Sequence, residues 1–145
     1  EQFDPAEIEA YERELLGYAA ERLSAVDGLR IYGATPDKCA IVSFTVEGTH
    51  PYDVGMILDK LGIAVRTGQH CAEPVMTHYG VPGMCRASLA MYKTCGEIDA
   101  LAAGVERTVR REMEERNSTI SLSRVQSRTK FGLCRDGEMD ERNSR

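Results

Sequence analysis

The sequence lacks the features that mark several large classes of protein. No apolar run approaches the roughly 20 residues that a membrane-spanning helix needs. The first residues, Glu1-Gln2-Phe3-Asp4, are too polar for a signal peptide. The net charge is −5 and the pI about 5.3, so the basic excess typical of nucleic-acid binding is missing. We therefore expect a cytoplasmic protein with neither a nucleic-acid nor a membrane partner.

The cysteines form neither a disulfide framework nor a zinc motif. There are five of them, an odd number, and no two form a C-x-x-C pair: Cys39, Cys71, Cys85, Cys95 and Cys134. This pattern is typical of reduced thiols. His70 and Cys71 could join His78 or Cys85 around a metal ion, but the spacing is not diagnostic. We expect no metal site.

What the sequence does contain suits one α/β domain followed by surplus chain. Of its 145 residues, 42% are hydrophobic, enough for a core. Apolar periodicity, capping boxes at Asp4 and Thr94 and turn residues predict a small sheet of three or four strands, largely antiparallel and covered by helices. The two long terminal helices should pack on it. Helices are expected at 5–25, 51–61, 74–79 and 95–115, and strands at 29–32, 39–46, 62–65 and 84–91.

The character of the chain changes after residue 116. Residues 117–145 are rich in Ser, Arg, Asp, Glu and Asn, and their few apolar residues have no sustained period. Such a segment buries little apolar surface. We therefore expect a domain at 1–116 and a polar, disordered tail at 117–145, with Cys134 an exposed thiol.

Chemistry is concentrated in the loop that holds Cys71. The loop follows the expected strand at 62–65 and precedes a short helix, so it is held by ordered elements yet open to solvent. Arg66 and His70 lie close by in sequence, and both would favour the reactive thiolate. Arg86 falls within an apolar strand, where a charge must reach solvent, a partner or a ligand. Cys71 is thus a candidate nucleophile, although a lone loop cysteine can also be incidental.

Three blocks of the sequence together resemble one family. They are His50–Gly55, Gly62–Pro74 with its Arg-Thr-Gly-Gln-His-Cys-Ala-Glu-Pro, and Cys85–Tyr92 with its Cys-Arg-Ala-Ser-Leu-Ala-Met-Tyr. They look like the C-terminal small domain of SufS-type (group II) cysteine desulfurases. These are class V aminotransferase-family enzymes that use pyridoxal phosphate and have the type I fold. The likeness extends from the first helix to about Arg111.

The resemblance implies an enzyme that takes sulfur from L-cysteine, releases L-alanine and keeps a persulfide on Cys71. A sulfur-acceptor protein would receive that sulfur for iron–sulfur cluster assembly. Arg86 matches the arginine that holds the substrate carboxylate, and Arg66 is the second cation of the pocket. His70 either assists proton transfer or shapes the loop. The full-length enzyme would be a homodimer, and selenocysteine lyase is a variant of the same chemistry.

The sequence also departs from the family. Gln69 replaces a second histidine, which puts the role of an imidazole there in doubt. The cofactor's lysine follows a histidine in these enzymes, but no lysine does so here, and the large cofactor-binding domain is missing. We therefore expect a fragment that lacks pyridoxal phosphate and is inactive alone. A free-standing persulfide carrier and an inactive truncated product are the alternatives.

Overall fold

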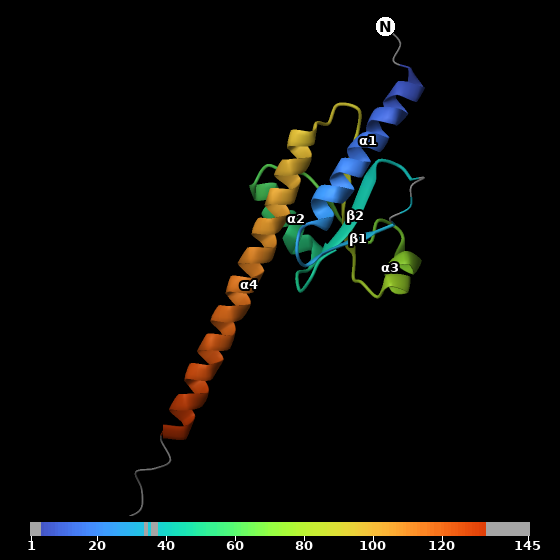
Figure 1. Ribbon diagram of the computed structural model, residues 1–145. Coiled ribbons are helices and arrows are strands. Elements are labelled where there is room, and N and C mark those ends of the chain that lie inside the picture. The colour runs from blue at the N-terminus through green and yellow to red at the C-terminus, as the bar shows by residue number, and fades with distance from the viewer. Residues whose placement is uncertain (1–3, 34, 36–37, 133–145) are drawn as a thin grey trace, which may run out of the picture. The chain divides into compact units, whose positions relative to one another are not determined.

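The computed structural model describes the backbone of residues 4–33, 35 and 38–132, and side chains as far as residue 117 (Figure 1). Four helices and four strands alternate irregularly along these residues. They are α1 (Pro5–Ser24), β1 (Leu29–Tyr32), β2 (Ile41–Val46), α2 (Pro51–Lys60), β3 (Arg66–Gly68), α3 (Glu73–Tyr79), β4 (Met84–Ser88) and α4 (Cys95–Gly132). The α/β class is as predicted.

Helix starts follow local sequence signals closely. The Ala6 amide donates to Asp4 Oδ1 at 3.0 Å, which caps α1. The Thr94 amide donates to Glu97 Oε2 at 2.9 Å, and the Glu97 amide donates back to Thr94 Oγ1 at 3.4 Å. These bonds satisfy amides that have no partner inside the helix. Both predicted caps are therefore confirmed.

The four strands form one antiparallel sheet in the order β1-β2-β4-β3. The prediction of a small, antiparallel sheet is confirmed. The register places Tyr32 opposite Ser43, Ser43 opposite Arg86, and Arg86 opposite Arg66. Because directly paired residues point to the same face, these four side chains form one row across the sheet.

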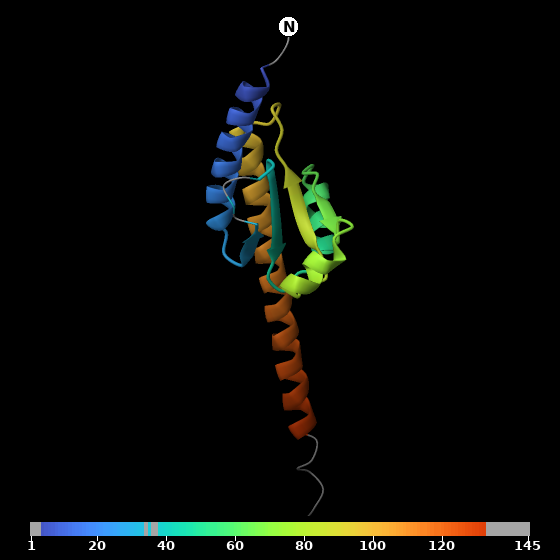
Figure 2. The same cartoon turned by 90° about the vertical axis from the view of Figure 1, so that its right-hand side faces the viewer.

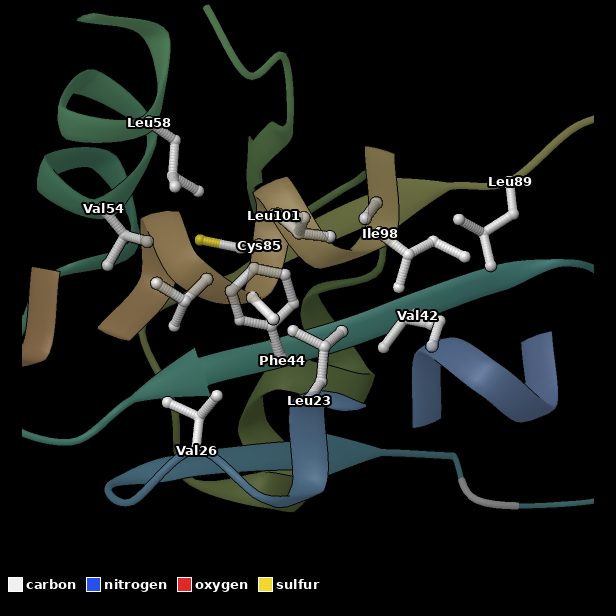
Figure 3. Close-up of a cluster of buried hydrophobic side chains, with 14 of the residues drawn as sticks. Leu23, Val26, Val42, Phe44, Val54, Leu58, Cys85, Leu89, Ile98 and Leu101 are labelled. Atoms are coloured by element: carbon white, nitrogen blue, oxygen red, sulfur yellow. The ribbon is translucent and has the colours of Figure 1, made fainter. Parts of the chain in front are cut away.

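The hydrophobic core fills the other face of the sheet. Val42 and Phe44 of β2 and Cys85 of β4 are fully buried there. They pack against apolar side chains of α1, α2 and α4, as the close-up shows for Leu23, Val54, Leu58 and Leu101 (Figure 3). Alternation along β2 therefore separates a core face from a face with polar side chains. As predicted, both long terminal helices pack on the sheet, α4 through its residues 98–109.

The short helix α3 lies on the opposite side of the sheet from α1 and α2 (Figure 1). Figure 2 looks onto this second face, where β2 (teal) passes in front of α4. Met76 of α3 is buried against Tyr32 and Met84, with Val81 beside them. Tyr32 thus belongs both to this small cluster and to the row, whose other members are Ser43, Arg86 and Arg66.

The expected strand at 62–65 was wrong. Residues 63–65 run outside the ladder, and β3 begins at Arg66, where pairing with β4 starts. Their apolar side chains have another cause: Ile63 and Val65 pack against the core. A Cβ on Gly104 of α4 would lie 2.8 Å from Ile63 Cδ1, so the helix and this segment are in close contact. Helix contact and strand pairing both select apolar residues.

Two other strands are shorter than predicted. β4 ends at Ser88 rather than residue 91, and β2 begins at Ile41 rather than Cys39. The two differences have one cause, because the pairing between β2 and β4 ends where Ile41 faces Ser88. Beyond that point Leu89 still donates its amide to the Ala40 carbonyl at 2.7 Å.

The expected end of the last helix near Glu115 was also wrong, because α4 continues to Gly132. Residues 116–131 contain neither proline nor glycine, so no residue there breaks a helical backbone. The chain divides into two units, Glu1–Glu112 and Met113–Arg145. Residues 133–145, with Cys134, lie outside the described residues, and the predicted limit between a domain at 1–116 and a disordered tail stays a prediction.

Candidate active site

Two arginines face each other across the second face of the sheet. Arg66 of β3 is exposed and stands directly opposite Arg86 of β4, which is half-buried. Like charges directly opposite each other in a sheet destabilise it. Within the residues that the structure describes, neither arginine has an ion pair or a side-chain hydrogen bond. An anion placed between them would remove the repulsion, and a guanidinium fork matches a carboxylate.

Ser43 completes the polar part of this row. It lies on β2, opposite Arg86 and on the same face, and its side chain is half-buried. Ser43 was not among the site residues predicted from the sequence. The alternation of buried Val42 and Phe44 around it was the signal that could have placed it on the second face.

The loop that follows β3 has an unusual backbone. His70 and Cys71 both have positive φ angles, 55° and 58°. Residues other than glycine seldom adopt this left-handed conformation, and two in succession need support from their surroundings. The Ala72 amide donates to the Gln69 carbonyl at 2.9 Å and closes a tight turn around them. The turn leaves Cys71 exposed to solvent.

His70 connects this turn to the neighbouring strand. Its Nε2 lies 3.0 Å from the Met84 carbonyl oxygen, which can only accept, so Nε2 carries the proton. Its Nδ1 is buried and has no hydrogen-bond partner. Burial lowers the pKa of His70, and the charges of Arg86 and Arg66 lower it further, although the Met84 bond opposes this. His70 therefore favours its neutral form.

A second contact holds the same end of the sheet. A Cβ on Gly83 would lie 3.1 Å from both the carbonyl carbon and the oxygen of Gly68, which is the last residue of β3. Backbone atoms cannot turn aside as a flexible side chain can. Glycine at 83 thus lets β4 begin close to the base of the Cys71 loop, a constraint that sequence analysis missed.

The other thiols among the described residues differ from that of Cys71 in burial or in position. Cys85 is fully buried in the core, and burial raises its pKa to about 12. Its Sγ lies 3.4 Å from the Pro51 carbonyl. Because the thiolate is the nucleophile, Cys85 is inert in the folded chain. Cys39 and Cys95 are exposed but lie before β2 and at the start of α4, away from the arginine row.

The predicted site residues come together in the structure. Arg66, His70 and Arg86 interact electrostatically, and Cys71 follows His70 in the same turn. In the described part of the chain, no three His, Cys, Asp or Glu side chains are grouped so that they could hold a metal ion. Of the helices described, none has the length and apolar character needed to cross a membrane. The site therefore offers an exposed thiol next in sequence to a histidine that interacts with two cations.

The fold and this site together identify the chain as a domain from a known class of proteins that share a transferase fold. The family profile described as "Aminotransferase class-V" matches residues 1–101, and the chain belongs to this family. Among its curated relatives is a "Cysteine desulfurase" of Pectobacterium carotovorum, 52% identical over 101 residues that make up 70% of this chain and 25% of the relative. A "Probable cysteine desulfurase" of Xylella fastidiosa is 48% identical over 99 residues, which are 68% of this chain and 24% of that protein.

Solved structures agree with these relatives. The cysteine desulfurase CsdA of Escherichia coli superposes with a TM-score of 0.69 at 33% identity, over 75% of this chain and 27% of that one. A cysteine desulfurase of Thermococcus onnurineus gives 0.67 at 38% identity, over 71% of this chain and 26% of that chain. The chain thus spans about a quarter of the length of the relatives that it matches.

Proposed function

We propose that this chain is the C-terminal part of a cysteine desulfurase of group II, and that Cys71 is its nucleophile. The net reaction is L-cysteine plus the Cys71 thiol giving L-alanine plus a Cys71 persulfide. One carbon–sulfur bond breaks and one sulfur–sulfur bond forms, while the carbon left behind gains a proton. The observation that carries this proposal is the unpaired cation row, Arg66 opposite Arg86, at the base of a turn that exposes a thiol.

Arg86 would bind the carboxylate of L-cysteine. It is half-buried on a central strand, so its position is fixed by pairing on both sides. Arg66 on the edge strand is exposed and would give the second contact or stabilise the thiolate. A bound carboxylate would neutralise the repulsion between the two guanidinium groups, which supports an anionic ligand over a structural role.

Cys71 would attack the substrate sulfur as a thiolate. Its exposure lets the substrate reach the sulfur. Exposure also lets a sulfur-acceptor protein reach the persulfide afterwards. We propose such an acceptor, in the cytoplasm, with iron–sulfur cluster assembly as the destination of the sulfur.

The residues of this chain do not fit a site for pyridoxal phosphate. The cofactor is held through a lysine in enzymes that use it as an electron sink. The lysines here are Lys38, Lys60, Lys93 and Lys130, and none of them lies in β3, β4 or the Cys71 loop. Lys93 is paired with Glu97 at 2.8 Å. We therefore assign no step to the cofactor in this chain, and place it in a larger domain of the same enzyme, which would act as a homodimer.

A chimera tests the proposal with an intact enzyme. Residues 1–112 would replace the corresponding C-terminal part of the E. coli cysteine desulfurase, and alanine and sulfide would be assayed with L-cysteine. We expect activity that Cys71→Ser abolishes and that the matched control Cys95→Ser, another exposed cysteine, leaves unchanged. A folded chimera with no activity, or activity indifferent to Cys71→Ser, would contradict the proposal. Competition between cysteine and selenocysteine separates the lyase variant.

The exposure of Cys71 favours one second candidate, a free-standing persulfide carrier. In that case the 145-residue chain alone would accept sulfur from an active desulfurase. Mass spectrometry would then find one added sulfur atom on Cys71. An unmodified Cys71 under these conditions would remove this candidate and leave the first one standing.

A further inference from the structure

The turn at Cys71 needs support that its own sequence does not supply. Its two left-handed residues are a histidine and a cysteine, whereas glycine is the usual residue in this conformation. The bond from the Ala72 amide to the Gln69 carbonyl closes the turn at 2.9 Å but does not connect it to the sheet. A contact from the turn to a strand is therefore required to hold Cys71 in one place.

The side chain of His70 makes that contact. Its Nε2 donates to the carbonyl of Met84 at 3.0 Å. Met84 is opposite Gly68, the last residue of β3 before the turn, and two residues before Arg86 on β4. One hydrogen bond thus joins the turn to the strand that carries the half-buried arginine, where the two strands meet.

The two ring nitrogens of His70 argue against proton transfer. Nε2 already donates its proton to a carbonyl, so this nitrogen has no free lone pair. Nδ1 has a lone pair, but it is buried and has no hydrogen-bond partner. A general acid or base must be within hydrogen-bond reach of the group it serves. Neither nitrogen meets that requirement while the turn has this shape.

We propose that His70 is a positioning residue, which holds the left-handed turn against β4 through its bond to the Met84 carbonyl and itself transfers no proton. This inference rests on the proposed role of Cys71 as nucleophile. It settles the choice between proton transfer and loop shaping that the sequence leaves open. It also explains why an imidazole can lie beside two arginines, because a neutral ring suffers no repulsion from them.

Paired substitutions separate the two roles of the ring. Glutamine can place an amide N–H near the position of Nε2, whereas asparagine reaches only the position of Nδ1. We therefore expect His70→Gln to keep the bond to Met84 and His70→Asn to lose it. His78→Gln is the matched control, because His78 is an exposed histidine on α3.

The first readout is hydrogen exchange of the Ala72 amide in the 145-residue chain, measured by NMR. We expect exchange on the order of tenfold faster in His70→Asn and unchanged in His70→Gln and His78→Gln. A long-range ¹H–¹⁵N spectrum of the wild-type ring should show the proton on Nε2. Unchanged Ala72 exchange in His70→Asn, or a proton on Nδ1, would overturn the proposal.

The second readout is the rate of alanine formation by the chimera, against pH. We expect His70→Gln to keep the wild-type pH profile and most of kcat, and His70→Asn to lose kcat on the order of tenfold or more. Equal losses in both variants with Ala72 still protected in His70→Gln would show proton transfer and refute positioning. The exchange of the Ala72 amide is measured without cofactor or substrate. An inactive wild-type chimera would therefore contradict only the proposed function and not the positioning role of His70.

Discussion

Replacement of Arg86 by glutamine tests whether the arginine row is kept for a ligand rather than for the fold. Glutamine retains part of the side chain and a polar end but removes the charge. If Arg66 and Arg86 repel each other in the free chain, Arg86→Gln should make the domain more stable while it destroys binding of an anionic substrate. A gain in stability from the loss of a site residue is the signature of a functional constraint.

The magnitude follows from the register. Arg66 and Arg86 are direct cross-strand partners, whose Cβ atoms lie about 5 Å apart, and we assume about 8 Å between the two guanidinium charges because the long side chains can spread. Two unit charges at about 8 Å repel by ~0.5 kcal/mol in water and by ~2 kcal/mol at an effective dielectric constant near 20. Because Arg66 is exposed and Arg86 half-buried, the lower part of this range applies. We expect Arg86→Gln to raise the free energy of unfolding by about 0.5–1 kcal/mol at low salt.

Urea unfolding of four proteins measures this effect: the wild type, Arg86→Gln, Arg66→Gln and the double variant. Each single variant should be stabilised, and the double variant should gain little more, because either change removes the same repulsion. At about 1 M salt, where the Debye length is near 3 Å, the gain should disappear. Arg30→Gln is the control, because Arg30 lies opposite the uncharged Thr45 and 5.0 Å from the centre of the Tyr32 ring. This substitution should not raise the free energy of unfolding.

Two results would refute the reasoning. If Arg86→Gln destabilises the chain at both salt concentrations, Arg86 has a structural partner and the fold itself needs its charge. If the effects of the two single variants are additive in the double variant, the arginines do not interact, and their register across β3 and β4 does not define a common anion site.

Three further predictions concern the same end of the sheet. The pKa of His70 is lower in the folded chain than the usual value of 6.5, so between these two pKa values the unfolded chain binds more protons than the folded one. The free energy of unfolding should therefore fall as the pH drops from 6.5 towards the folded pKa. In urea unfolding at a series of pH values, His70→Gln should remove this dependence on pH. Cys85, with a pKa of about 12, should react with iodoacetamide at pH 8 roughly a thousandfold more slowly than Cys71. Peptide mass spectrometry measures the two rates. Equal rates would mean that the core around Cys85 opens readily. Gly83→Ala should lower the free energy of unfolding by about 1–3 kcal/mol, as measured by urea unfolding. Gly17→Ala, at an open site in a helix, should raise it by about 0.5–1 kcal/mol. Equal effects of the two substitutions would show that the backbone contact at Gly83 is loose.

Local signals were sufficient to predict the helix starts. Asp4 and the Thr94–Glu97 pair cap helices through atoms no more than three residues away, so no distant part of the chain is involved. Strand β1 was also correct in its bounds, and β2 was correct except for its first two residues, because alternation there reflects a sheet with one buried face. The segment at 62–65 misled because contact with α4 at Gly104 selects the same apolar residues that a strand does.

The site could be predicted in its residues but not in its geometry. Cys71, His70, Arg66 and Arg86 were identified from their types and neighbours in sequence. That Arg66 faces Arg86, with Ser43 next in the row, depends on the register of β4 with β3 and with β2, whose facing residues are 20 and 43 positions away from Arg86 in the sequence. The apolar pattern of a strand determines which side chains it buries, but it does not determine which residue of a distant strand lies opposite.

The sequence by itself determined the class of fold, the exposed thiol and the chemistry that the site offers, because composition, caps and residue types act over a few neighbouring positions. The tertiary structure alone decided how those groups act together. The antiparallel pairing of β3 with β4 sets two like charges opposite each other, and the Met84 carbonyl selects which nitrogen of His70 bears the proton. Both depend on strand pairing, which joins residues that are distant in the chain and is governed by the packing of the whole domain.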